Sequence, residues 1–350
     1  MIDSMEEHFG NPSSIHHYGR ISKAAIEAAR KKVANILNCS IGEIFFLSSA
    51  TEANNMVIQQ SVKSLNVKRI ISSPTEHPCV CNTIESLKDE VEIIWLDVDK
   101  KGNIELSQLS QLLQSDTKTL VSLMHSNNEI GTLHPFNEIA SICKEHGALF
   151  HSDTVQSVGK LPLDLSETTV SFISASAHKF HGPKGVGFVY INGDNIIGPS
   201  FYGGAQERNM RAGTENITGI IGLAKALELA DKQMMERKEY ITKLRAHFKK
   251  GLLEVNPDIY FNGDQDNYLH TVLSVSFPAD KRADMIMFNL DINGICASSG
   301  SACSSGIEND SPVLGAIQHP VERKTIRFSF SHLNTIDEVD YTLEKIKSFI

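Results

Sequence analysis

Hydrophobic residues in the first 190 positions follow two alternating patterns. Between residues 19 and 37 they recur every three or four positions, which is typical of an amphipathic helix, and residues 44–47 form a short apolar run typical of a buried strand. The same alternation predicts further helices from residue 51, after residue 77 and over residues 106–113 and 136–145, and further strands over residues 69–72, 91–96, 120–124, 149–151, 170–174 and 186–191. Strands separated by helices predict βαβ units, so we expect an α/β fold with a mostly parallel sheet.

The pattern changes in the C-terminal part of the chain. Residues 215–250 are rich in Ala, Leu, Glu and Lys and predict a long connecting helix, and the sequence after Pro257 is of mixed α+β type. We therefore divide the chain into an N-terminal segment (residues 1–18), a large α/β domain that includes the connecting helix (residues 19–250) and a smaller C-terminal domain (residues 251–350).

Charge, hydropathy and cysteine spacing exclude several classes of protein. A formal net charge of -9 disfavours a nucleic-acid partner. The longest apolar runs have the length of strands, and the acidic start resembles neither a secretory signal nor a transit peptide, so we expect a cytoplasmic protein without a membrane partner. The six cysteines form no C-x-x-C pair, which indicates neither a zinc site nor a disulfide framework, and no metal site is predicted.

Polar residues gather directly after several predicted strands. In open α/β sheets the ligand lies beyond the carboxyl ends of the strands, so the loops at these ends are candidate sites. Four of them are unusually polar, namely residues 48–55, 126–131, 153–156 and 174–179.

Two of these loops carry groups that suit a phosphorylated, nitrogen-containing ligand. Ser49 and Thr51 lie between a strand and a helix, where the helix N-terminus favours a phosphate, although either hydroxyl could simply cap the helix. Asp153 follows an apolar strand and is expected to be partly buried, where it needs a cationic partner. A protonated pyridine nitrogen is one such partner, and a structural salt bridge is the alternative.

A lysine at a third strand end completes the pattern. Lys179 lies among small residues after the predicted strand 170–174, where partial desolvation would lower its pKa and favour Schiff-base formation, although most lysines are solvated surface groups. A phosphate cradle, a buried acid and such a lysine together are what a pyridoxal-phosphate site requires.

The sequence as a whole resembles the cysteine desulfurases of the NifS/IscS type, which belong to the class V aminotransferase-like group. The resemblance extends from residue 9 to the C-terminus and rests on the motifs Ala50-Thr51-Glu52, Thr75-Glu76-His77, Asn127-Asn128-Glu129-Ile130-Gly131, Gln156-Ser157-Val158-Gly159-Lys160, His178-Lys179, Met210-Arg211-Ala212-Gly213-Thr214 and Ser298-Ser299-Gly300-Ser301-Ala302-Cys303. It implies fold type I, with a seven-stranded type of sheet in the large domain, and pyridoxal 5'-phosphate as cofactor.

The resemblance also implies roles at the cofactor ring. Lys179 would bind the cofactor covalently and later move protons, Asp153 would pair with the pyridine nitrogen, and His77 would stack on the ring as a further catalytic residue. Asn128 would lie at the substrate end of the cofactor, and Gln156 would contact the ring oxygen.

The same resemblance implies a phosphate site shared between two subunits. Ala50, Thr51, Ser176 and His178 would hold the phosphate, and Thr214 would reach it from the second subunit of a homodimer.

Two further residues would act on the substrate, L-cysteine. Arg327 would bind its carboxylate, a task that suits a planar guanidinium. Cys303 lies in a run of Ser, Gly and Ala over residues 298–306, which alone would suit a small buried thiol equally well. By resemblance it is the catalytic thiol that takes the sulfur as a persulfide, leaves L-alanine, and supplies the sulfur to an acceptor such as an iron–sulfur scaffold, for cluster assembly or thiolation.

Two alternatives remain at this point. One is another class V pyridoxal-phosphate enzyme such as a selenocysteine lyase. The other is an inactive scaffold-docking protein, because the strand and the Asp-containing Ala-Thr-Thr segment with which the family usually starts are missing here.

Overall fold

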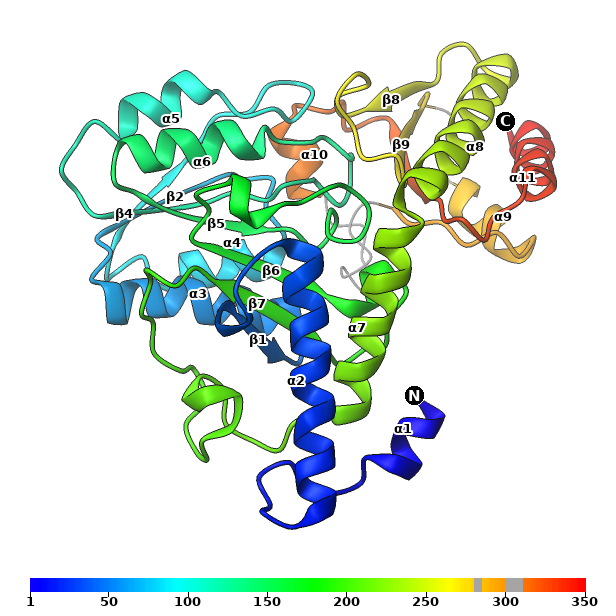
Figure 1. The fold of residues 1–350 in the computed structure, drawn as a ribbon. Helices are drawn as coiled ribbons and strands as arrows, with labels where there is room; N and C mark the ends of the chain where they lie inside the picture. Colours follow the sequence, from blue (N-terminus) through cyan, green and yellow to red (C-terminus); the bar gives the residue numbers. More distant parts are fainter. Residues whose placement is uncertain (280–284, 300–310) are drawn as a thin grey trace. The chain divides into compact units, whose positions relative to one another are not determined.

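The computed structural model describes residues 1–279, 285–299 and 311–350. The chain forms two compact units, each built from several stretches of sequence (Figure 1). Unit 1 comprises residues 1–96, 106–125 and 135–234, and unit 2 comprises residues 97–105, 126–134 and 235–350. No helix in the described part of the chain is both long and apolar enough to cross a membrane.

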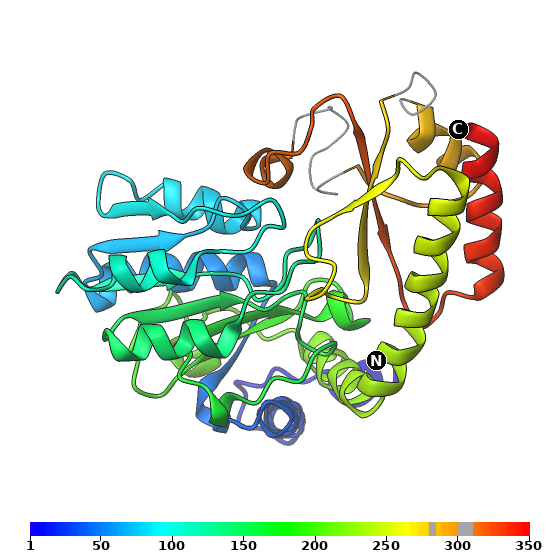
Figure 2. The same ribbon diagram turned by 90° about the horizontal axis from the view of Figure 1, so that it is seen from above.

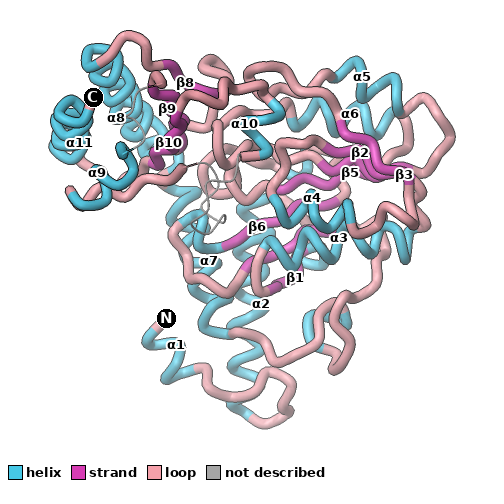
Figure 3. The backbone as a smooth tube through the Cα atoms, turned by 180° about the vertical axis from the view of Figure 1, so that it is seen from behind, coloured by secondary structure: helices cyan, strands magenta, loops and turns pink. Residues whose placement is uncertain are grey.

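Unit 1 is built on a seven-stranded sheet in the order β1-β7-β6-β5-β4-β2-β3 (Figure 3). Only β7 pairs antiparallel with its neighbours, so the expected mostly parallel α/β sheet is confirmed. The strands are β1 (Ile44–Leu47), β2 (Arg69–Ser72), β3 (Glu92–Trp95), β4 (Thr119–Ser122), β5 (Leu149–Asp153), β6 (Phe172–Ser176) and β7 (Gly187–Ile191).

Helices cover both faces of this sheet. In Figure 1, α5 and α6 lie on one side of it and α3 and α4 on the other. Every residue of β1, β4, β6 and β7 is buried, as expected for strands that are covered on both faces. The helices of unit 1 are α1 (Ile2–Glu7), α2 (His17–Leu37), α3 (Ala50–Leu65), α4 (Pro78–Glu85), α5 (Leu106–Leu112), α6 (Phe136–Glu145) and α7 (Ile217–Lys232), with short 3-10 turns η1 (Ile41–Glu43), η2 (Leu165–Glu167), η3 (Ala177–Phe180) and η4 (Gln206–Asn209).

The single long helix predicted over residues 215–250 is wrong. The structure has two helices there, α7 (Ile217–Lys232) and α8 (Met234–Val255), with Gln233 outside both at φ -107° and ψ 8°. No Gly or Pro marks this break in the sequence. The residues at the break, Lys232, Gln233 and Met234, are all good helix formers. The break coincides with the division of the chain into its two units, so packing rather than local propensity explains it.

Unit 2 contains a three-stranded antiparallel sheet in the order β10-β9-β8, drawn from β8 (Tyr260–Asn262), β9 (Val272–Phe277) and β10 (Lys324–Ser329) (Figure 2). Apolar residues of β9 and β10 pack with those of three helices in one buried cluster. These helices are α8, α9 (Ile286–Ile292) and α11 (Ile336–Phe349), and a short helix α10 (Pro312–Ala316) precedes β10.

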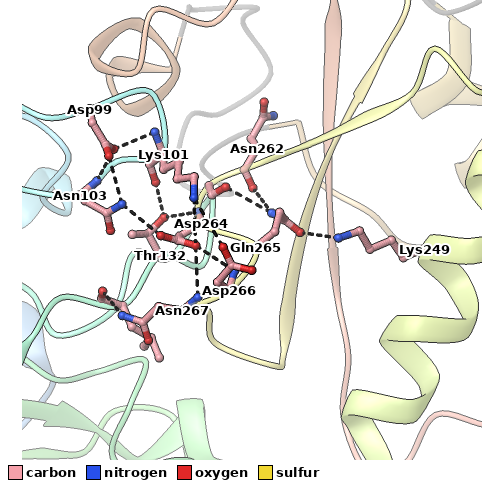
Figure 4. A network of polar contacts seen from close by, with 12 residues as sticks. Asp99, Lys101, Asn103, Thr132, Lys249, Asn262, Asp264, Gln265, Asp266 and Asn267 are labelled. Atoms are coloured by element: carbon pink, nitrogen blue, oxygen red, sulfur yellow. Dashed lines mark hydrogen bonds and ion pairs between the residues drawn. The ribbon is translucent and has the colours of Figure 1, made fainter.

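A polar network attaches the two inserted segments of unit 2, residues 97–105 and 126–134, to the rest of that unit (Figure 4). The Thr132 hydroxyl donates to the carbonyl of Lys101 at 2.6 Å and accepts from the backbone N–H of Asp264 at 3.1 Å. The Asn103 amide donates to the Asp264 carboxylate at 3.1 Å. These bonds hold the turn that carries Asn128 on the body of unit 2.

Candidate active site

The carboxyl ends of parallel strands in unit 1 carry most of the predicted site residues. This is the edge of an open α/β sheet at which ligands bind. The residues are Ala50 and Thr51 after β1, His77 after β2, Asp153 at the end of β5, and Ser176, His178 and Lys179 at and after β6.

Asp153 is a buried carboxylate, 7% exposed, and each of its two oxygens accepts a hydrogen bond. It accepts from the side-chain amide of Asn54 at 2.8 Å and from the backbone N–H of Val155 at 3.0 Å. Burial raises the pKa of Asp153, and these bonds, with the charges of His77 and Lys179, offset the effect incompletely. A buried carboxylate of raised pKa gains most from a further cationic group, so the site suits a protonated ring nitrogen.

A chain of buried side chains orients the amide that supports Asp153. Asn54 Oδ1 lies 3.1 Å from Nε2 of His151, whose Nδ1 lies 2.9 Å from the hydroxyl of Ser122. Burial lowers the pKa of His151 to about 3, so the ring is neutral. Because Asn54 Oδ1 can only accept, His151 carries its proton on Nε2, and the Asn54 amide therefore presents its NH₂ group to Asp153.

His77 is held in one orientation by the start of α4. It is the N-cap of that helix, and its Nδ1 accepts from the backbone N–H of Cys79 at 3.1 Å and lies 2.9 Å from the Cys79 sulfur. Burial lowers the pKa of His77, and Lys179 lowers it further, whereas Asp153 raises it. With Nδ1 accepting, the neutral ring has its proton on Nε2.

Two of the predicted phosphate residues, Ala50 and Ser176, meet at the N-terminus of α3. The backbone N–H of Ala50 donates to the hydroxyl of Ser176 at 2.8 Å, and both residues are buried. Thr51 follows on the helix and is exposed, as is His178 in η3. A side chain at Gly187 would meet the carbonyl of Ala175 and lie 3.1 Å from the backbone of Ser49, so glycine allows the strands to approach here. A helix N-terminus with adjacent hydroxyls suits an anion.

Lys179 lies in η3 and is exposed, so the partial desolvation expected for it is not present in the structure. The charge of Lys179 lowers the pKa of both His77 and Asp153. Lys179 therefore lies near these two predicted residues. η3 follows the end of β6 directly, which places Lys179 at the same sheet edge as Asp153.

A second lysine supports the turn that carries Gln156. Lys160 Nζ donates to Gln156 Oε1 at 3.2 Å, so the NH₂ group of that amide faces away from the lysine. Burial, with a smaller effect of the Lys179 charge, lowers the pKa of Lys160 to about 7. Gly159 adopts φ +74°, and a Cβ there would lie 2.9 Å from that of Phe180, so this turn packs closely on η3.

The segment that ends at Thr214 is anchored by two ion pairs. Glu207 is buried and pairs with both terminal nitrogens of Arg30, at 2.6 and 2.8 Å. Arg211 pairs with Glu52 of α3 at 2.9 Å. Thr214 itself is exposed.

The two predicted substrate residues in the described part of unit 2 lie together. Arg327 of β10 donates from Nη1 to the carbonyl of Asn128 at 2.9 Å. Asn128 lies in a turn shaped by Asn127, whose side-chain oxygen accepts from the backbone N–H groups of residues 129 and 130 at 2.8 and 2.9 Å. Cys303 lies outside the described residues.

Three supporting residues could not be identified from the sequence. Asn54 is four positions after Ala50 on α3, and His151 is two positions before Asp153 on β5, so each lies on the same face as a predicted residue. That spacing is the only sequence signal for them. Lys160 belongs to the motif that begins at Gln156, and no feature of the sequence indicates its contact with the side chain of Gln156 four positions earlier.

The chain is similar to known proteins over nearly its whole length. Residues 1–342 match the aminotransferase class-V family model. The chain is 43% identical to the cysteine desulfurase IscS of Dictyoglomus turgidum, over 99% of this chain and 89% of that protein. It is 40% identical to the putative cysteine desulfurase IscS 1 of Bacillus subtilis, over 97% of this chain and 90% of that protein.

A solved structure extends the similarity to three dimensions. It is described as a NifS-like protein, is 36% identical, and superimposes with a TM-score of 0.92 over 99% of this chain and 93% of that chain. The chain therefore belongs to the aminotransferase class-V family, and within it to the pyridoxal-phosphate-dependent cysteine desulfurases of the NifS/IscS type.

Proposed function

We propose that this protein is a pyridoxal-phosphate-dependent cysteine desulfurase that converts L-cysteine to L-alanine and retains the sulfur as a persulfide on Cys303. The single observation that carries the proposal is the buried Asp153 at the sheet edge that also bears Lys179. Asn54 donates a hydrogen bond to this carboxylate, but its pKa is still raised by burial. Relatives named cysteine desulfurase that match nearly the whole chain support the choice of reaction.

The residues of unit 1 fit the cofactor. Asp153 would pair with its ring nitrogen, the N-terminus of α3 with Ser176 would hold its phosphate, and Lys179 would bind its aldehyde. When bound, pyridoxal phosphate accepts the electron pair released at the α-carbon of an amino acid. A supporting feature is the exposure of Lys179, which allows its amine to change partners during the reaction.

The remaining steps belong to the protein's own side chains. Lys179 would move the proton between the α-carbon and the β-carbon side of the substrate, and the neutral His77, with its proton on Nε2, would donate to the group above the ring. Arg327 and Asn128 would orient the substrate carboxylate. In sum, the bond between the β-carbon and sulfur of cysteine breaks, a sulfur–sulfur bond forms at the Cys303 thiolate, and the β-carbon gains a proton to give alanine.

A homodimer is the proposed functional unit, because Thr214 is exposed on a segment that Arg211 and Glu207 anchor to unit 1. The proposed sulfur acceptor is a protein such as an iron–sulfur scaffold. The cytoplasmic location expected from the sequence stays a prediction.

The test combines a spectrum, a product assay and peptide mapping. The purified protein should show the visible absorbance of a lysine-bound cofactor, release alanine from L-cysteine, and carry one extra sulfur on the peptide that contains Cys303. Equal release of alanine from selenocysteine but none from cysteine would favour a selenocysteine lyase. A colourless protein that releases no alanine would refute the enzyme assignment and leave a docking protein.

A further inference from the structure

A buried carboxylate lies beside the predicted binding group for the substrate carboxylate. Arg327 donates to the carbonyl of Asn128, and Glu129 is the next residue. Glu129 is only 4% exposed. The charge of Arg327 acts on it, because this charge lowers the pKa of Glu129 against the larger raising effect of burial. The carboxyl group of Glu129 thus lies within electrostatic reach of the guanidinium that would bind the substrate.

Ser311 holds that carboxylate. Its hydroxyl lies 2.5 Å from Glu129 Oε2, in a bond that joins residues 182 positions apart in the sequence. Arg327 influences Glu129 through charge, whereas the side-chain hydrogen bond that Glu129 accepts comes from Ser311. A hydrogen bond to a charged or partly charged acceptor is among the stronger ones, so Ser311 fixes the orientation of this side chain.

The backbone of Glu129 is fixed independently of Ser311. The side-chain oxygen of Asn127 accepts from the backbone N–H of Glu129 at 2.8 Å, and the backbone N–H of Asn127 donates to the carbonyl of Thr132 at 2.9 Å. Thr132 is in turn held through Lys101 and Asp264 in the network of Figure 4. Loss of the Ser311 hydroxyl would therefore allow the side chain of Glu129 to change rotamer, while the backbone turn at residues 127–132 stays in place.

Without the Ser311 hydrogen bond, the carboxylate of Glu129 and the carboxylate of the substrate would compete for the guanidinium of Arg327. An ion pair between a carboxylate and an arginine is favourable when the arginine is half-buried, because the attraction between the two charges is screened less there than at the surface. We propose that Ser311 is a positioning residue: by hydrogen bonding to Glu129 it keeps that carboxylate from pairing with Arg327 and so favours binding of the substrate carboxylate there. This inference rests on the proposed function, in which the substrate is an amino acid.

The experiment measures binding and needs no turnover. The holoenzyme is titrated with L-alanine and, separately, with ethylamine, which is alanine without its carboxylate, and the change in the visible absorbance of the bound cofactor gives each dissociation constant. Ser311→Ala should weaken alanine binding about tenfold, equivalent to about 1.4 kcal/mol, and should leave ethylamine binding unchanged. Ser311→Thr keeps the hydroxyl and should retain the wild-type constant for alanine.

A double-mutant cycle separates this role from a structural one. Ser311 also caps α10, since its hydroxyl accepts from the backbone N–H of Leu314 at 3.3 Å, and loss of the cap would weaken binding whatever residue 129 is. If Ser311 acts through the charge of Glu129, adding Ser311→Ala to Glu129→Gln should cause no further loss. An undiminished tenfold loss in that background, or an equal loss for ethylamine, would overturn the inference alone. A wild-type protein that responds to neither L-cysteine nor L-alanine would overturn the proposed function and this inference together.

Discussion

Asn54→Ala tests whether a buried chain of side chains holds Asp153 in place. The change removes the amide that donates to Asp153 at 2.8 Å and leaves Nε2 of His151 without its partner at 3.1 Å. A hydrogen bond to a charged group is worth about 1.5–3 kcal/mol, and a buried donor left unsatisfied costs about 1–3 kcal/mol. Ala is the better helix former by roughly 0.6 kcal/mol, which offsets part of this loss.

The net loss of unfolding free energy is then about 3 kcal/mol, which lowers the melting temperature of a unit of this size by roughly 6–12 °C. Thermal unfolding followed by circular dichroism measures it. Asn55→Ala is the matched control, because the bonds of that amide among the described residues stay within the same helix: it donates to the carbonyl of Thr51 at 2.9 Å and accepts from the amide of Gln59 at 3.5 Å. We expect the control to unfold within about 2 °C of the wild type. Equal melting temperatures for the two variants would show that Asn54 does not support the carboxylate.

Three further outcomes are expected. Lys179→Ala should abolish the visible absorbance of the bound cofactor, whereas Lys184→Ala should keep it; the reverse result would disprove the assignment of the cofactor lysine. Burial lowers the pKa of Lys160 to about 7. Between about pH 7 and pH 10 the unfolded chain therefore binds a proton at Lys160 that the folded chain does not, so the folded state becomes more stable as the pH rises. The melting temperature of the wild type should rise relative to that of Lys160→Met across this range. A constant difference would contradict that pKa. Sedimentation at micromolar protein should give a dimer that Thr214→Ala leaves assembled but with weaker phosphate binding, and a monomer that binds the cofactor tightly would refute a shared site.

Much of unit 1 could be predicted from local patterns. The strands over residues 44–47 and 69–72 were predicted with their observed bounds, because short apolar runs between polar turns have few alternatives in an α/β protein. The break at Gln233 could not be predicted, since no residue there disfavours a helix. The membership of residues 97–105 and 126–134 in unit 2 depends on contacts such as that of Asn103 with Asp264, which lies 161 positions away.

The candidate site shows the same limit. Asp153 and Lys179 could be proposed because each follows an apolar strand, and strand ends are where such sheets bind ligands. The exposure of Lys179 could not be predicted, because it depends on how η3 leaves β6. Asn54 and His151 have no local signature, since an amide in a helix and an imidazole in a strand are ordinary until the two elements are packed together.

The assembly of unit 2 from distant parts of the chain has a consequence for biosynthesis. Thr132 and its acceptor Lys101 are both made early, but Asp264, which binds the Thr132 hydroxyl, is 132 residues further on. At about 5–20 residues per second the ribosome needs roughly 7–26 s to reach it. During that interval unit 1 can complete its sheet as far as β7, whereas the turn that carries Asn128 waits for partners not yet translated. The nascent protein thus acquires Arg327, and with it the support for Asn128, only near the end of synthesis, after the strand ends that carry Asp153 and Lys179 have been made.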